Sequence, residues 1–223
     1  MLLLSGQRCS HQRSSSLNSF VADSVARFQK QQRTAAKSRS SHSLCGLSTS
    51  QIRKTAKATV GQFKNKSWTK LRARSLTASK FAVAYRAIIS GSEYRVAKFL
   101  ENWLSRPNLQ GIPALKWGLR HEKEAIHCYE QLIRTRVQPT GLWLSADGAL
   151  GASPDGLVYG GEGIIEVKCP NSCRDAESWQ DGLETGIIPH KLQFEDEDVE
   201  QVSLKKSRDY SHQVQGQLYM TGG

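Results

Sequence analysis

Two short apolar runs with a glycine-rich connection constrain the fold of this chain more than any other feature. Residues 157–159 and 164–169 are rich in aliphatic, β-branched and aromatic side chains, and three of the four residues between them are glycine. This pattern is typical of a β-hairpin. Side chains alternate along a strand, so we expect Ile165 and Val167 on one face and Glu166 and Lys168 on the other.

The predicted hairpin brings two carboxylates and an ammonium group together. Asp155 precedes the first strand, and Glu166 and Lys168 share one face of the second. Carboxylate oxygens suit Mg²⁺ or Mn²⁺, and a bound metal lowers the pKa of water and neutralises charge on a phosphoryl oxygen. For an isolated Glu-x-Lys, the alternative is an ion pair on an exposed strand, worth at most about 1 kcal/mol. The residue types alone leave both interpretations open.

Two amphipathic helices are expected upstream of the hairpin. Residues 92–104 have helical apolar spacing, with Ser92 as the N-cap and Pro107 beyond the end. A second helix is expected over residues 115–134. Its apolar stripe consists of Leu119, Ile126, Tyr129 and Ile133. Glu122 falls on this stripe, where a carboxylate is costly unless it is paired, binds a metal or reaches water at the edge.

The positive charge of the chain lies in its N-terminal third. Residues 1–79 contain 15 Lys and Arg against one acid, a net of +14, although the whole chain of 223 residues carries +11. We expect residues 1–60 to be a disordered, basic, Ser- and Arg-rich arm and residues 61–223 to be the folded domain. Such an arm can attract nucleic acid, act as an organelle transit peptide or have no role. No apolar stretch is long enough to cross a bilayer.

Sequence blocks around these residues resemble a known family. Pro154-Asp155, ten residues and Glu166-Val167-Lys168 form the PD-(D/E)XK nuclease signature. The flanks, including Cys169-Pro170, the helix around Glu122, the downstream segment 210–218 and the upstream segment 68–79, resemble the YqaJ-type viral recombinases, which are phage lambda exonuclease-like nucleases. These blocks follow the family's order and together span residues 68–223.

The resemblance implies a fold and a set of site residues. The expected fold is α/β (α+β), a restriction-endonuclease-like core with a mixed central sheet flanked by helices. By resemblance, Asp155, Glu166 and the carbonyl of Val167 bind the metal, and Lys168 is catalytic. Glu122 and Gln213 complete the catalytic set. Arg72, Ser79 and Ser153 are the expected DNA or phosphate-binding residues, and an arginine can donate two parallel hydrogen bonds to a terminal phosphate.

The implied activity is Mg²⁺-dependent hydrolysis of DNA, with Mn²⁺ as a substitute, by a 5′-to-3′ exonuclease acting on duplex ends in recombination or repair. The alternative is an inactive DNA-binding or recombination-partner module with the same fold. The family further implies a ring-shaped homotrimer and a single-strand annealing partner. We expect an intracellular protein, in the nucleus or mitochondrion if the arm is a targeting signal.

Three features depart from the family pattern. Asp147, the nearest match for a further family aspartate, lies eight residues before Asp155. In the family the fold continues beyond the helix that corresponds to residues 210–218, so the last core strand is expected to be missing from a chain that stops at Gly223. Residues 195–198 form an acidic stretch that we expect to be a solvated loop.

Overall fold

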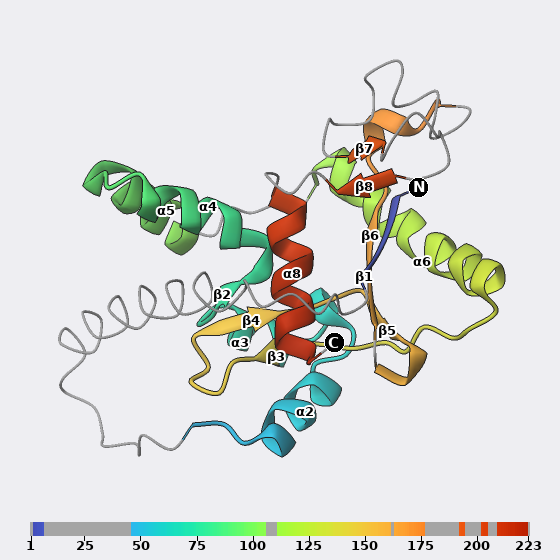
Figure 1. Cartoon of the computed structure of the whole chain (residues 1–223), viewed down its shortest axis with the longest axis horizontal. Helices are drawn as coiled ribbons and strands as arrows, with labels where there is room; N and C mark the ends of the chain where they lie inside the picture. The colour runs from blue at the N-terminus through green and yellow to red at the C-terminus, as the bar shows by residue number, and fades with distance from the viewer. Residues whose placement is uncertain are drawn as a thin grey trace.

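A computed structural model describes residues 2–6, 46–105, 111–161, 163–176, 192–194, 202–204 and 209–222. The helices are α2 (Thr49–Ala58), α3 (Lys66–Arg72), α4 (Phe81–Ile89), α5 (Glu93–Ser105), α6 (Pro113–Ile133) and α8 (Asp209–Thr221). The strands are β1 (Leu2–Gly6), β2 (Leu76–Thr77), β3 (Trp143–Leu144), β4 (Leu150–Ala152), β5 (Gly156–Val158), β6 (Gly163–Lys168), β7 (Leu192–Phe194) and β8 (Val202–Leu204). Short 3₁₀ turns are η1 (Gln62–Lys64), η2 (Ala78–Lys80), η3 (Tyr159–Gly161) and η4 (Asn171–Cys173). Figure 1 shows the arrangement.

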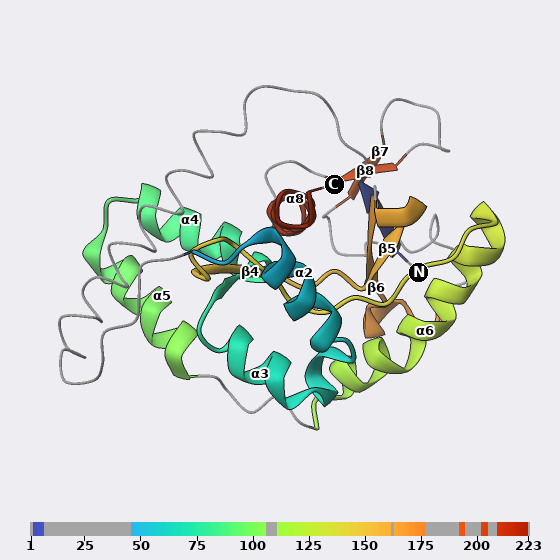
Figure 2. The ribbon, with the colours of Figure 1, turned by 90° about the horizontal axis from the view of Figure 1, so that it is seen from below.

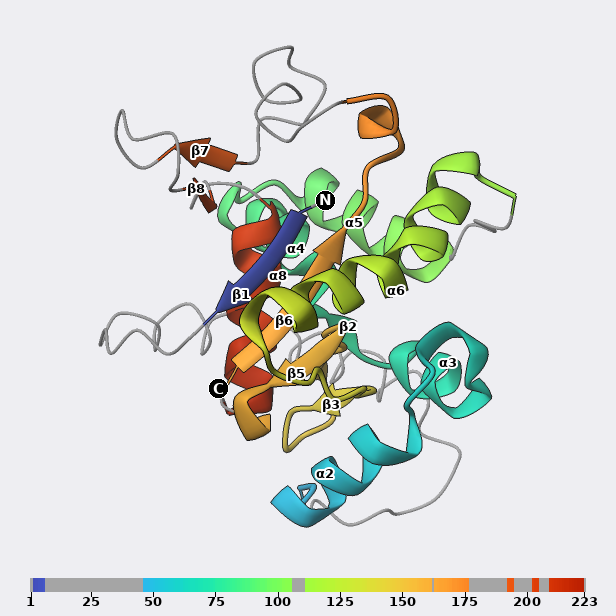
Figure 3. The same cartoon turned by 90° about the vertical axis from the view of Figure 1, so that its right-hand side faces the viewer.

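The strands form small sheets between helices, which confirms the expected mixed α/β class. Instead of one central sheet, the strands form two three-stranded sheets, with orders β1-β6-β5 and β2-β4-β3, and a β7-β8 pair. In the first sheet β6 is central. It packs against α6 and against α8, and Figures 2 and 3 both show it between these two helices. The central strand is therefore covered on both faces, as its buried side chains require.

The expected hairpin is confirmed. β5 and β6 pair antiparallel, with Gly156 opposite Ile165 and Val158 opposite Gly163. Gly160 and Gly161 in the connection have φ values of 70° and 108°, which β-carbon-bearing residues rarely adopt. The two helices expected upstream of the hairpin are confirmed as α5 and α6.

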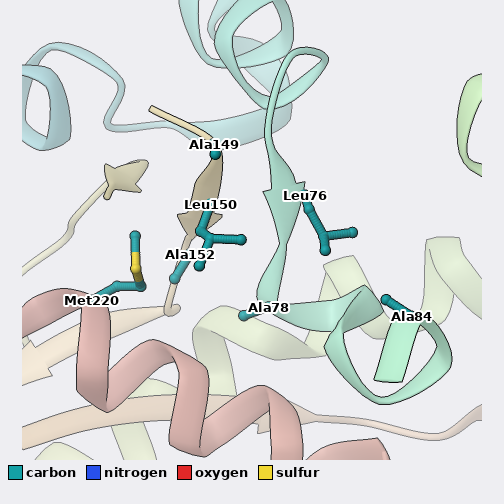
Figure 4. Packing of buried hydrophobic residues seen from close by; sticks show 7 residues of the cluster. All are labelled: Leu76, Ala78, Ala84, Ala149, Leu150, Ala152 and Met220. Atoms are coloured by element: carbon teal, nitrogen blue, oxygen red, sulfur yellow. The ribbon is translucent and has the colours of Figure 1, made fainter. Parts of the chain in front are cut away.

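A hydrophobic core holds the second sheet against α8 and α4. Its buried residues are Leu76, Ala78, Ala84, Ala149, Leu150, Ala152 and Met220, drawn in Figure 4. Close packing here depends on Gly216 of α8, because a Cβ at this position would lie 2.5 Å from the ring of Phe81. Small residues on facing elements thus let α8 approach the η2 turn and α4.

The folded part of the chain begins earlier than the composition predicts. α2 lies inside the segment expected to be an arm, and Ala56 and Thr59 are 2% and 1% exposed. The Thr59 hydroxyl accepts a hydrogen bond of 2.7 Å from the backbone N–H of Leu142, directly before β3. The polar composition of this segment did not predict a folded helix, because few side chains of α2 are buried. Residues 7–45 of the expected arm lie outside the described residues.

The apolar stripe predicted for α6 is partly wrong. Ala125 and Tyr129 are buried, with Ile126 and Ile133 packed beside them, but Leu119 is 47% exposed. The buried stripe therefore starts one turn later than the apolar spacing suggests. No helix within the described ranges is long and apolar enough to span a membrane.

Candidate active site

The two faces of β6 have different neighbours. Ile165 and Val167 pack with Ala125 and Tyr129 of α6 in an apolar cluster. Glu166 lies on the opposite face and contacts α8 through hydrogen bonds. The alternation predicted from the sequence is confirmed. It places a carboxylate that is only 3% exposed between the sheet and the last described helix.

Glu166 receives hydrogen bonds on both carboxylate oxygens. Its Oε1 accepts a bond of 2.6 Å from the Gln213 side-chain amide and a second from the Lys168 ammonium group. Its Oε2 accepts a bond of 2.6 Å from the Gln217 amide. A buried carboxylate would be very costly without such partners, so these three donors hold the charge at this position. The structure thus brings together three of the predicted site residues.

Gln217 was not among the predicted site residues. It lies one helical turn after Gln213, so both amides project from the same face of α8 toward Glu166. It is 1% exposed, and its carbonyl Oε1 has no hydrogen-bond partner within the described structure. The i, i+4 pair of glutamines was the signal that could have identified it. Gln215, which is between them in sequence, is exposed.

Asp155 lies at the end of the hairpin nearest Glu166. Its backbone N–H donates to the carbonyl of Ile165 at 3.0 Å, and its side-chain Oδ2 accepts from the Val167 N–H at 2.6 Å. The Asp155 side chain therefore accepts the hydrogen bond that the Val167 N–H would otherwise donate to a backbone carbonyl of a partner strand. In a β-strand the N–H and C=O of one residue point to the same edge. The carbonyl of Val167 thus faces the edge that Asp155 occupies.

Burial, together with the nearby charge of Glu166, raises the pKa of two carboxyl groups. Burial, and secondarily the charge of Glu166, raises the pKa of Asp155 from 3.8 to about 8. Burial and then Glu166 likewise raise the pKa of Glu122, which Lys168 and Lys123 partly oppose. Glu122 therefore lies within electrostatic reach of the site, as its position on the buried side of α6 predicts. Without a bound cation, Asp155 is mostly protonated at neutral pH.

Lys168 remains a cation in this site. Burial alone would lower its pKa, but attraction by Glu166, the hydrogen bond to Glu166 and attraction by Asp155 raise the pKa above its ordinary value. Its ammonium nitrogen also lies 5.2 Å from the centroid of the Tyr210 ring. A lysine held in this way supplies positive charge and hydrogen bonds and does not accept a proton.

The three residues expected to bind phosphate lie around one aromatic ring. The Arg72 guanidinium carbon is 4.8 Å from the centroid of the Trp68 ring, and its Nη2 donates to the Ser79 hydroxyl at 3.3 Å. The Trp68 indole N–H donates to the Ser153 hydroxyl at 2.9 Å. Burial lowers the pKa of Arg72, and the charge of Glu166 opposes this shift. Arg72 is therefore close enough to Glu166 for their charges to interact.

The oxygen atoms of this site suit a hard cation, although the acidic side chains do not form a complete set of metal ligands. Among the described residues, no three His, Cys, Asp or Glu side chains are close enough to hold a metal. Asp155, Glu166 and the Val167 carbonyl nevertheless offer oxygen donors on adjoining positions of the hairpin. A carboxylate has about four lone-pair sites, so Glu166 can keep its amide donors and still bind a cation. The raised pKa of Asp155 also fits, because a cation would displace its proton.

Asp147, the match for a further family aspartate, makes its hydrogen bonds within a turn. It is exposed in the turn between β3 and β4, where its Oδ1 accepts from the Ala149 N–H at 2.9 Å and from the Ser145 hydroxyl. These bonds are those of a turn-stabilising aspartate. Residues 195–198, the predicted acidic loop, lie outside the described residues.

Comparison with known proteins identifies a family and a distant structural likeness. A family model described as a YqaJ-like viral recombinase domain matches residues 67–223. No curated protein matches the chain. An alkaline exonuclease from Laribacter hongkongensis is similar, with 24% identity, a TM-score of 0.44, and coverage of 70% of this chain and 69% of that chain. The same exonuclease in complex with dAMP gives 25% identity, the same TM-score and the same coverage.

Proposed function

The chain belongs to the family of YqaJ-like viral recombinase domains, and we propose that it is a metal-dependent nuclease that hydrolyses phosphodiester bonds in DNA. The proposal depends on one observation. A buried glutamate, fixed by two amides and a lysine, lies within electrostatic reach of an aspartate whose pKa is raised first by burial and then by the charge of that glutamate. Buried carboxylates with perturbed pKa values are typical of functional sites, and their oxygens suit a hard divalent cation.

We assign the roles as follows. Asp155, Glu166 and the Val167 carbonyl would hold Mg²⁺ or Mn²⁺, which supplies polarisation of the phosphate and a lowered pKa of bound water. Lys168, a cation at neutral pH, stabilises the negative charge that develops on the phosphoryl oxygens. Gln213 orients Glu166, and Glu122 adds negative charge at the border of the site.

For the direction of attack, we propose a 5′-to-3′ exonuclease on duplex ends that acts in recombination or repair. Arg72 supports this proposal, because its guanidinium can donate parallel hydrogen bonds to a terminal phosphate, with the Ser79 and Ser153 hydroxyls nearby. We also predict that the protein forms a homo-oligomer and that it has a single-strand annealing partner. Sedimentation and co-purification would test these two predictions.

The decisive experiment measures cleavage of linear 5′-phosphorylated duplex DNA with Mg²⁺. Wild type is compared with Lys168→Met and Glu166→Gln, and Glu124→Gln is the control because Glu124 is exposed on α6. We expect turnover in wild type and in the control only. Absence of turnover in all proteins would favour the alternative of an inactive DNA-binding module. Cutting of covalently closed circles would contradict the exonuclease proposal, and indifference to the 5′-phosphate would contradict the role of Arg72.

A further inference from the structure

The described segment around α2 is strongly basic. Residues 46–80 contain nine Lys and Arg and no Asp or Glu, and the family model matches the chain only from residue 67. Three of these cations, Arg53, Lys54 and Lys57, are exposed on α2. None of the ion pairs among the described residues involves these three side chains. Their charge is therefore available to an anionic partner.

The three cations lie on one side of α2. Successive residues of an α-helix are about 100° apart around the axis, so positions 53, 54 and 57 fall within an arc of about 100°. Ala56 and Thr59 project from the other side and are buried. A Cβ at Gly141 would lie 2.6 Å from the Ala56 carbonyl oxygen, so this side of α2 packs tightly against the segment before β3. Figure 3 shows α2 next to β3. Packing thus fixes the helix and leaves its basic side exposed.

A hydrogen bond connects this segment to the candidate active site. The Gln62 side-chain amide, in the η1 turn that follows α2, donates to the carbonyl of Pro154 at 3.1 Å. Pro154 directly precedes Asp155, a proposed metal ligand. Lys57 is five residues before Gln62, so their Cα atoms are at most about 18 Å apart. The basic side of α2 is therefore within reach of a DNA duplex whose end lies at the acids.

We propose that the basic side of α2 binds the sugar-phosphate backbone of the duplex that enters the active site. The inference rests on the proposed nuclease function and deepens it, because it assigns the holding of the duplex to a helix upstream of the residues that the family model matches. Duplex DNA carries one negative charge for about every 1.7 Å of its axis, so several phosphates can meet the three cations. Such contacts read no bases, so binding through α2 is independent of DNA sequence and sensitive to salt.

The test removes the charge of α2 and measures binding without cleavage. Fluorescence anisotropy in EDTA follows a labelled, blunt-ended DNA duplex from about 50 to about 200 mM KCl. The variant combines Arg53→Gln, Lys54→Gln and Lys57→Gln. Glutamine has nearly the helix propensity of lysine and arginine, so α2 should persist, which circular dichroism and thermal unfolding check. Each lost phosphate contact reduces the slope of log Kobs against log salt by about 0.9, so we expect a total reduction of about 2 to 3.

A matched control removes the same charge elsewhere. It combines Arg95→Gln, Lys116→Gln and Arg120→Gln, which are exposed positions of α5 and α6. The control should keep the wild-type slope. An unchanged slope in the α2 variant would overturn the inference, and so would an equal reduction in the control, because net charge alone would then explain the loss. Both results leave the nuclease proposal intact if wild type cuts linear DNA with Mg²⁺.

Two further results separate the inference from its alternatives. A reduced slope with duplex RNA but not with duplex DNA would overturn the assignment of α2 to the DNA substrate. Salt-sensitive binding of duplex DNA through α2, in a protein that cleaves no DNA with Mg²⁺, would contradict the nuclease proposal and retain α2 as a DNA-binding surface.

Discussion

Replacing Asp155 by asparagine should stabilise the metal-free protein. The folded protein holds this carboxyl at a pKa of about 8, whereas the unfolded chain returns it to about 3.8. Between these values the unfolded state releases a proton that the folded state keeps, so stability falls as pH rises from about 4 to about 8. Asparagine has the shape of the neutral carboxyl, and its Oδ1 can still accept from the Val167 N–H.

The size of the effect follows from the difference in pKa. The ordinary pKa of 3.8 lies 3.2 below pH 7, and each pH unit is worth about 1.4 kcal/mol. The free-energy cost of keeping Asp155 protonated at pH 7, which asparagine removes, is therefore at most about 4 kcal/mol. For a chain of this size, a gain of about 4 kcal/mol raises Tm by about 8 to 16 °C, which is the upper limit of the effect. Below about pH 4 the gain should nearly vanish, because the carboxyl is then protonated in both states.

Thermal unfolding in EDTA at pH 4 and at pH 7 measures this difference. Asp147→Asn is the matched control, because it makes the same side-chain change at an exposed position in a turn. Excess Mg²⁺ should then raise Tm of wild type but not of Asp155→Asn. A variant that melts at or below wild type in EDTA at pH 7, or a difference independent of pH, would refute the reasoning.

Further predictions concern α8 and α2. Gln217→Met should lower kcat on linear duplex DNA about 10- to 100-fold with KM unchanged, because Glu166 loses a positioning donor, whereas Gln215→Met should match wild type. Gly216→Ala should destabilise the protein by about 1–3 kcal/mol in urea unfolding, since the new Cβ would meet the Phe81 ring, and Phe81→Leu should relieve the loss. Thr59→Val should cost about 1–3 kcal/mol by leaving the Leu142 N–H unpaired, whereas Thr55→Val, whose hydroxyl bond is local, should cost less. Equal effects in variant and control would contradict the first and third predictions, and no effect of Gly216→Ala would contradict the second.

Short-range patterns in the sequence predicted the hairpin and the placement of Glu166 beside Lys168. Alternation along β6 placed Glu166 and Lys168 together, and the glycines of the connection identified the turn. These features depend on residues within about a dozen positions, where strand geometry leaves few alternatives. The helices α5 and α6 were predictable for the same reason, because their apolar spacing is local.

Long-range packing decided the features that the sequence did not predict. The polar composition around α2 concealed that Thr59 bonds to Leu142, 83 positions away. Gln217 became part of the site only because α8 lies against β6 across 51 positions. Leu119 has the right spacing for the stripe of α6, but 47% of it is exposed. Periodicity indicates which residues can be buried, and tertiary contacts decide which of them are.

The partners of Glu166 are supplied late in translation. The amides of Gln213 and Gln217 emerge from the ribosome after every other group of the proposed centre, so a nascent chain that ends before α8 leaves Glu166 with Lys168 but without its two amide donors. Docking of α8 both closes the core and completes the centre, so unfinished polypeptides of this protein should be unable to cut nucleic acid.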